Sequence, residues 1–139
     1  MTQPFIQLRG VKKIYRSGRA EHLAISDATF DVMPGDLVSL VGPSGCGKST
    51  LLKILAGLHG HDGGEVKIGS AEHAFDPSRD VGMVFQAPLL LKWRRILENV
   101  LLPAEILGLP MGEARERARA LLALVGLGGN EDKYPYELS

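Results

Sequence analysis

Residues 42–50 read Gly-Pro-Ser-Gly-Cys-Gly-Lys-Ser-Thr and match every fixed position of the pattern G-x-x-x-x-G-K-[ST]. This pattern is typical of a phosphate-binding loop that connects a buried β-strand to an α-helix. Its glycines let backbone N–H groups approach an anion closely, and its lysine adds a positive charge. The stretch therefore predicts an α/β fold that binds a nucleoside triphosphate.

The residues on either side of this loop have the composition of the strand and the helix that it requires. Residues 36–41 are mostly apolar and lie between a Pro-Gly pair and Gly42, which predicts a buried strand in a parallel sheet. Residues 48–58 carry leucines and an isoleucine at helical spacing and contain no proline. We therefore expect the order strand, loop and helix, with the positive end of the helix directed at the phosphates.

Each residue of the loop has an expected role in binding. Lys48 would contact the β and γ phosphates, Ser49 would ligate Mg²⁺, and Thr50 would hydrogen bond to phosphate. Cys46 occupies a variable position, and the neighbouring sequence offers no histidine that would activate its thiol. The predicted binding residues are Gly42, Pro43, Ser44, Gly45, Cys46, Gly47, Lys48, Ser49 and Thr50.

The segments before and after the loop predict further elements. Alternating apolar residues at 5–15 and a short run at 28–32 indicate an antiparallel β layer ahead of the loop. Residues 81–85 form a compact apolar run; as a parallel neighbour in the central sheet, it would place Gln86 at the same edge as the loop. There the amide of Gln86 would reach Mg²⁺ or an attacking water. Helices are expected at 96–107 and 112–125.

Composition and charge exclude several classes of protein. Sixteen basic and sixteen acidic residues give a formal net charge of zero, which argues against a nucleic-acid-binding surface. No apolar stretch reaches the length of a membrane span, and the first residues lack the pattern of a secretory signal. A single cysteine cannot form an internal disulfide. We therefore expect a cytosolic chain without a nucleic-acid partner.

Together these features resemble the N-terminal half of an ATP-binding-cassette (ABC) transporter ATPase, over essentially all 139 residues. Residues 13–15, Lys-Ile-Tyr, resemble the aromatic loop of this family, with Tyr15 as its aromatic residue. Residues 42–50 match its Walker A loop. Residues 84–86, Val-Phe-Gln, resemble its Q-loop. Residues 93–100, Trp-Arg-Arg-Ile-Leu-Glu-Asn-Val, are similar to a segment of the nitrate, sulfonate and taurine importers. Residues 134–139 resemble the lead-in to the family signature Leu-Ser-Gly-Gly-Gln.

The resemblance implies a P-loop NTPase core with an antiparallel β subdomain on its N-terminal side and the start of a helical subdomain. The whole chain would be one partial domain, with the core and β layer at about 1–86 and the Q-loop and helical subdomain at about 87–139. Tyr15 would stack on adenine, which makes ATP the expected nucleotide. Lys48 and Gln86 would be the catalytic residues, and Ser49 and Gln86 the Mg²⁺ ligands.

The implied function is that of an importer subunit that couples ATP binding and hydrolysis to the transport of a small solute. The expected partners are transmembrane permease subunits, a second ATPase subunit and, indirectly, a periplasmic or extracellular solute-binding protein. The subunit would lie on the cytoplasmic side of the cell membrane. This sequence does not specify the solute, because the membrane subunits and the binding protein select it.

The printed residues stop two residues into the signature and contain no Walker B strand, D-loop or switch histidine. We therefore expect a fragment of a longer protein, with no ATP turnover by these residues alone because no general base polarises the water. A nucleotide-binding module that does not hydrolyse remains an alternative, as does another P-loop NTPase such as a kinase or GTPase. The kinase or GTPase alternative is disfavoured by the antiparallel layer, by Tyr15 and by the lack of a guanine-reading motif.

Overall fold

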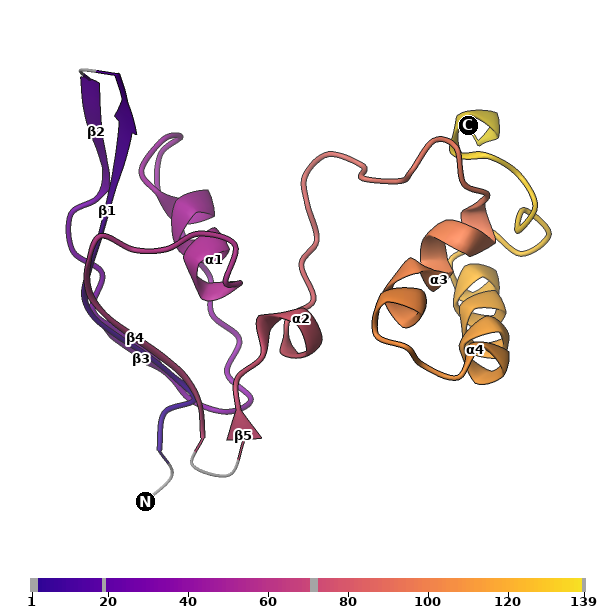
Figure 1. Cartoon of the computed structure of the whole chain (residues 1–139), viewed down its shortest axis with the longest axis horizontal. Helices are drawn as coiled ribbons and strands as arrows, with labels where there is room; N and C mark the ends of the chain where they lie inside the picture. The colour runs from indigo at the N-terminus through magenta and orange to yellow at the C-terminus, as the bar shows by residue number, and fades with distance from the viewer. Residues whose placement is uncertain (1–2, 19, 71–72, 139) are drawn as a thin grey trace. The chain divides into compact units, whose positions relative to one another are not determined.

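The structure is a computed structural model that describes residues 3–18, 20–70 and 73–138. The chain divides into two compact units, Met1–Met83 and Val84–Ser139 (Figure 1). Within the described residues, no helix combines the length and the apolar character needed to cross a membrane.

The first unit is built on an antiparallel sheet around one long strand (Figure 1). Its strands are β1 (Ile6–Ser17), β2 (Ala20–Ile25), β3 (Phe30–Val32), β4 (Gly63–Ser70) and β5 (His73–Ala74). β1 pairs with β2, β3 and β4, and β4 pairs with β5, always in the antiparallel direction. The antiparallel β layer that the alternating residues predicted is therefore confirmed.

β1 changes partners along its length. Its first half lies between β3 and β4, whereas its second half pairs with β2. The pairing with β4 shifts register between Arg9 and Lys12, and the pairing with β2 shifts between Lys13 and Ile14. Such irregularities bend a strand and increase its twist. The second half of β1 is consequently free to follow a different direction from the first.

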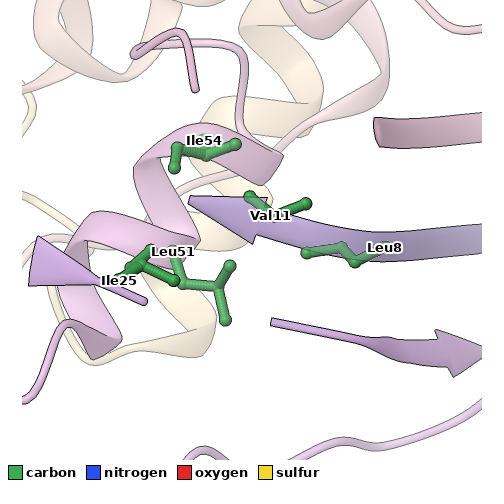
Figure 2. Packing of buried hydrophobic residues seen from close by; sticks show 5 residues of the cluster. All are labelled: Leu8, Val11, Ile25, Leu51 and Ile54. Carbon is green, nitrogen blue, oxygen red and sulfur yellow. The ribbon is translucent and has the colours of Figure 1, made fainter. Parts of the chain in front are cut away.

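The core of the first unit joins this sheet to helix α1 (Lys48–Leu55). Leu8 and Val11 of β1 are fully buried, and Ile25 of β2 lies in the same cluster. α1 contributes Leu51 and Ile54, which are three residues apart and share one face of the helix (Figure 2). This packing anchors the first turns of α1, and with them the loop at 42–47.

α1 ends earlier than residues 48–58 predicted. Gly57 has a φ of 70°, in the left-handed region that glycine adopts without strain, and its N–H donates to Ile54 O at 3.0 Å. The leucine that continues the apolar pattern beyond this point, Leu58, is exposed. The helix therefore ends just before the left-handed residue Gly57, although the apolar spacing of the sequence continues beyond it.

The predictions of two strands, at residues 36–41 and 81–85, are wrong for the described residues. Residues 36–41 and 81–85 belong to no strand there, and every strand pair in that part of the chain is antiparallel. Leu37 is 98% exposed, Val41 93% and Val84 97%, so these runs are not buried either. A strand requires a hydrogen-bonded neighbour, and neither run has one among the residues that the structure describes. A one-turn helix, α2 (Pro77–Asp80), precedes the second run.

The second unit consists of two packed helices and a short helical turn. They are α3 (Ile96–Ile106), α4 (Met111–Leu124) and the 3₁₀ turn η1 (Pro135–Glu137). Among the described residues of this unit, the buried side chains lie on α3 and α4: Ile96, Leu101, Ala118 and Leu122. Both helices confirm the sequence prediction to within one residue at each end. Gly126, which follows the end of α4, has a φ of 75°, in the left-handed region that favours glycine.

Candidate functional site

The predicted phosphate loop runs directly into α1, and its conformation depends on glycine. Gly45 and Gly47 have φ values of 81° and 98°, which L side chains rarely adopt. A Cβ at Gly47 would collide with the backbone oxygen of Ala24, and one at Gly42 would lie 2.8 Å from Cys46 Sγ. The loop therefore leaves backbone atoms, rather than side chains, next to the start of the helix. This arrangement fits a phosphate group, which backbone N–H groups and a helix N-terminus bind.

Lys48 points its ammonium group back into the loop. Its Nζ donates to Gly42 O and Pro43 O, each at 2.7 Å, and lies 3.4 Å from Cys46 Sγ. A phosphate oxygen is a stronger acceptor for an ammonium group than a neutral carbonyl oxygen is. The Lys48 ammonium group is thus held at the loop by two carbonyl oxygens, which are weaker acceptors than phosphate oxygens. The phosphate oxygens of a bound triphosphate would replace them.

The two hydroxyl residues after Lys48 differ in their surroundings. Ser49 is exposed, and its hydroxyl has no hydrogen-bond partner among the described residues. Mg²⁺ prefers oxygen ligands and keeps several waters, so one free hydroxyl beside a phosphate site fits it. Thr50 is half-buried, and its Oγ1 accepts a hydrogen bond from Tyr15 Oη at 3.5 Å.

Tyr15 is therefore brought to the helix that follows the phosphate loop. It lies in the second half of β1, with a half-buried side chain. Its ring contacts His59 edge to face, with the ring centroids 6.1 Å apart and an angle of 83° between the planes. The first unit thus brings Tyr15 to Thr50, the last of the residues predicted to bind the nucleotide at 42–50, although 35 residues separate the two in the chain.

Gln86 belongs to the second unit, where it is exposed and lies outside any strand. Its predicted position at the carboxyl edge of a parallel strand is wrong for the described residues, because residues 81–85 form no strand. Its predicted contact with Mg²⁺ or water stays a prediction.

Asp62 and Lys13 were missed by the sequence reasoning. Asp62 Oδ2 accepts from Ile14 N at 2.9 Å and lies 3.1 Å from Lys13 Nζ. These interactions keep the pKa of the Asp62 carboxyl below its usual value, first because of the Ile14 N–H and then because of Lys13. No local pattern indicates these contacts, since Asp62 lies 48 residues after Ile14 in the chain.

Asn99 orders the segment that resembles the importer motif, within the second unit. Its Oδ1 accepts from Leu91 N at 2.7 Å, and its Nδ2 lies 3.1 Å from Leu91 O. The same Nδ2 also lies 3.0 Å from both Arg94 O and Arg95 O. One amide on α3 therefore holds both ends of residues 91–95, and Trp93 between them is 75% exposed.

We expect Asn99→Asp to destabilise the second unit by about 2 kcal/mol, because a carboxylate oxygen would replace the amide donor beside three carbonyl oxygens. Asn130→Asp is the matched control, because its Nδ2 donates only to Leu127 O at 3.2 Å and Gly128 O at 3.5 Å. Hydrogen–deuterium exchange of residues 88–96 measures the effect. Equal exchange in Asn99→Asp and Asn130→Asp would contradict the role assigned to Asn99.

A cavity of about 300 Å³ lies in the second unit and contains none of the predicted site residues. Four of its charged lining groups form two ion pairs: Arg94 lies 2.7 Å from Glu105, and Arg95 lies 3.4 Å from Asp132. The candidate site is therefore the loop at 42–47 with the start of α1, where the Lys48 ammonium group, the Ser49 hydroxyl and the helix N-terminus lie together.

Comparison with known proteins gives matches along most of the chain. The family model described as "ABC transporter" matches residues 25–139. The methionine import ATP-binding protein MetN 2 of Enterococcus faecalis is 40% identical over 141 residues, which cover 96% of this chain and 41% of that protein. The Fe(3+) ions import ATP-binding protein FbpC 1 of Rhizobium meliloti is 47% identical over 118 residues, covering 84% of this chain and 33% of that protein.

A solved structure matches the fold. The post-hydrolysis dimer of the ATP-binding cassette MJ0796 bound to ADP and Pi superposes with a TM-score of 0.80 and 31% sequence identity. The match covers 96% of this chain and 63% of the MJ0796 chain. The present chain thus spans less than two thirds of that protein and less than half of the two import proteins.

Proposed function

The chain belongs to the ABC transporter family, and on this premise we propose that it is the ATP-binding part of an importer ATPase. In this role it couples ATP binding and hydrolysis to the transport of a small solute. The observation that carries the proposal is the loop at 42–47, which holds the Lys48 ammonium group at the start of α1. Tyr15, on β1, reaches the same helix.

The residues of the first unit have separate roles in holding the nucleotide. Lys48 exchanges its carbonyl acceptors for the β and γ phosphates, while backbone N–H groups of the loop and the first turn of α1 bind further phosphate oxygens. Tyr15 stacks on adenine, and Ser49 would hold Mg²⁺. Bound Mg²⁺ would supply positive charge that offsets the negative charge of the transferred phosphoryl group. We further propose that Gln86 would position the attacking water and, like Ser49, would ligate Mg²⁺.

The proposed assembly includes permease subunits in the membrane, a second ATPase subunit and, indirectly, a solute-binding protein. The names of the relatives support the importer role, and the dimeric state of MJ0796 supports a second ATPase subunit. The subunit works at the cytoplasmic face of the membrane. The alternative function is a module that binds ATP without hydrolysing it.

Three solute classes are the ones to test. The relatives named above import methionine and Fe(3+). Residues 93–100 resemble a segment of the nitrate, sulfonate and taurine importers, which adds small anions as the third class.

The function is tested by uptake of labelled methionine, ferric iron and taurine in cells that lack the gene. We expect one uptake activity to be lost and to return with the native gene but not with Lys48→Ala, because transport requires ATP bound at the loop. The intact protein, reconstituted in membranes, should release phosphate from ATP only when Lys48 is present. ATP binding without this release would favour the non-hydrolysing module.

A further inference from the structure

The loop after α1 is attached to the irregular part of β1 by one residue. Asp62 N donates to Lys12 O at 2.8 Å, and Asp62 Oδ2 accepts from Ile14 N at 2.9 Å. The same oxygen lies 3.1 Å from Lys13 Nζ. Asp62 thus holds three successive residues of β1, which lie where the pairing of this strand shifts register.

This attachment sets the course of the strand just before Tyr15. A strand can bend in several ways at an irregularity, because the regular ladder no longer determines its direction there. Asp62 Oδ2 provides a defined acceptor for the Ile14 N–H, and the ion pair with Lys13 adds a second restraint. The Asp62 side chain is 27% exposed and that of Lys13 15%, so water competes for this pair only in part.

The ring of Tyr15 is restrained on several sides. Lys13 Nζ lies 5.6 Å from its ring centroid, at the distance of a cation–π contact. The His59 ring packs against it edge to face, and the Tyr15 hydroxyl reaches Thr50 Oγ1. His59 is itself tied to the end of α1, since its N–H donates to Lys53 O at 3.2 Å. The ring is thus connected to both ends of the helix that follows the phosphate loop.

From these contacts we infer that Asp62 and His59 are positioning residues that hold the Tyr15 ring ready to stack on adenine. Asp62 fixes the strand that carries Tyr15, and His59 supports the edge of its ring. A ring held in place before binding loses less conformational freedom when a base stacks on it. This inference rests on the proposed role of Tyr15 in adenine binding and assigns neither residue a contact with the nucleotide.

The test compares two ligands that share the phosphates but not the base. Binding of ATP and of inorganic tripolyphosphate is measured by calorimetry on the intact protein, with Mg²⁺ present. We expect Asp62→Ala and His59→Ala each to weaken ATP binding roughly threefold to tenfold, the effect of disordering a stacked side chain. Tripolyphosphate binding should not change, since the phosphate loop is intact.

Three further variants separate positioning from simple disruption. His61→Ala is the matched control, because this exposed imidazole lies in the same loop and makes no hydrogen bond, ion pair or ring contact with the described residues. Asp62→Asn retains an acceptor for the Ile14 N–H and should restore part of the ATP affinity lost in Asp62→Ala. His59→Phe retains an aromatic edge against Tyr15 and should restore most of the affinity lost in His59→Ala.

Every outcome bears on the inference. Loss of both ligands in Asp62→Ala and His59→Ala would overturn it, because these residues would then support the fold in general. Unchanged ATP binding in both would overturn it as well. Tyr15→Ala distinguishes this failure from that of the proposed function: if it weakens ATP binding alone, only the positioning role fails. If Tyr15→Ala also leaves ATP binding unchanged, the adenine-stacking role itself is wrong.

Discussion

Lys48→Ala is expected to weaken ATP binding by about 2 to 4 kcal/mol, or roughly 30-fold to 1,000-fold. The structure holds the Lys48 ammonium group at the phosphate loop, 2.7 Å from two backbone oxygens. In the complex this group would face the β and γ phosphates, and no other described lysine or arginine side chain bonds to the loop. Removing it would leave negative phosphate oxygens without their closest counter-charge.

Calorimetry with Mg²⁺ and ATP measures this effect. Lys53→Ala is the matched control, because Lys53 lies on the same helix and its ammonium group has no partner among the residues that the structure describes. The control removes one positive charge from α1 and should change ATP affinity only slightly. Equal affinities for Lys48→Ala and the native protein would contradict the assignment of residues 42–50 to phosphate binding.

Leu8→Ala is expected to lower the free energy of unfolding by about 2 to 5 kcal/mol. Leu8 is fully buried on β1, in the cluster that includes Leu51 and Ile54 of α1. Removing three of its carbon atoms takes away apolar contacts and leaves a cavity between the sheet and the helix. Urea unfolding, followed by far-ultraviolet circular dichroism, measures the change.

Leu23→Ala is the control for this substitution, because Leu23 lies on the neighbouring strand β2 but is 55% exposed. Its effect on the unfolding free energy should stay below about 1 kcal/mol. Because Leu8 packs in the same cluster as α1, Leu8→Ala should also weaken ATP binding when the denaturant concentration approaches the unfolding midpoint. A Leu8→Ala protein as stable as Leu23→Ala would contradict the position of Leu8 in the core.

The helices could be predicted from the sequence because their signals are local. The glycines of residues 42–50, the start of α1 at Lys48 and the apolar spacing of α3 and α4 each depend on residues within a few positions of one another. Hydrogen bonds in a helix likewise join residues four apart. The end of α1 was the exception, since the left-handed turn at Gly57 ended the helix before its apolar pattern did.

Strand pairing was predicted only in part. An antiparallel layer was predicted from residues 5–15 and 28–32, which cover most of β1 and all of β3, and it is present. That β2 and β4 also pair with β1 was seen only in the structure. Residues 36–41 and 81–85 have the apolar character of buried strands, but they are not paired in the described residues. The apolar character of a segment indicates that it favours burial. It does not indicate whether a neighbouring strand elsewhere in the chain is present to form a parallel ladder with it.

The order of residues alone predicted a phosphate loop at 42–50, the helix that follows it and the family, because several short motifs occur in the expected order along the chain. Only the tertiary structure showed that Asp62 and His59 lie against the segment of β1 that presents Tyr15. Asp62 is 48 residues from its partner Ile14. A contact of that kind depends on how strand, helix and loop pack together, and no periodicity in the sequence records it.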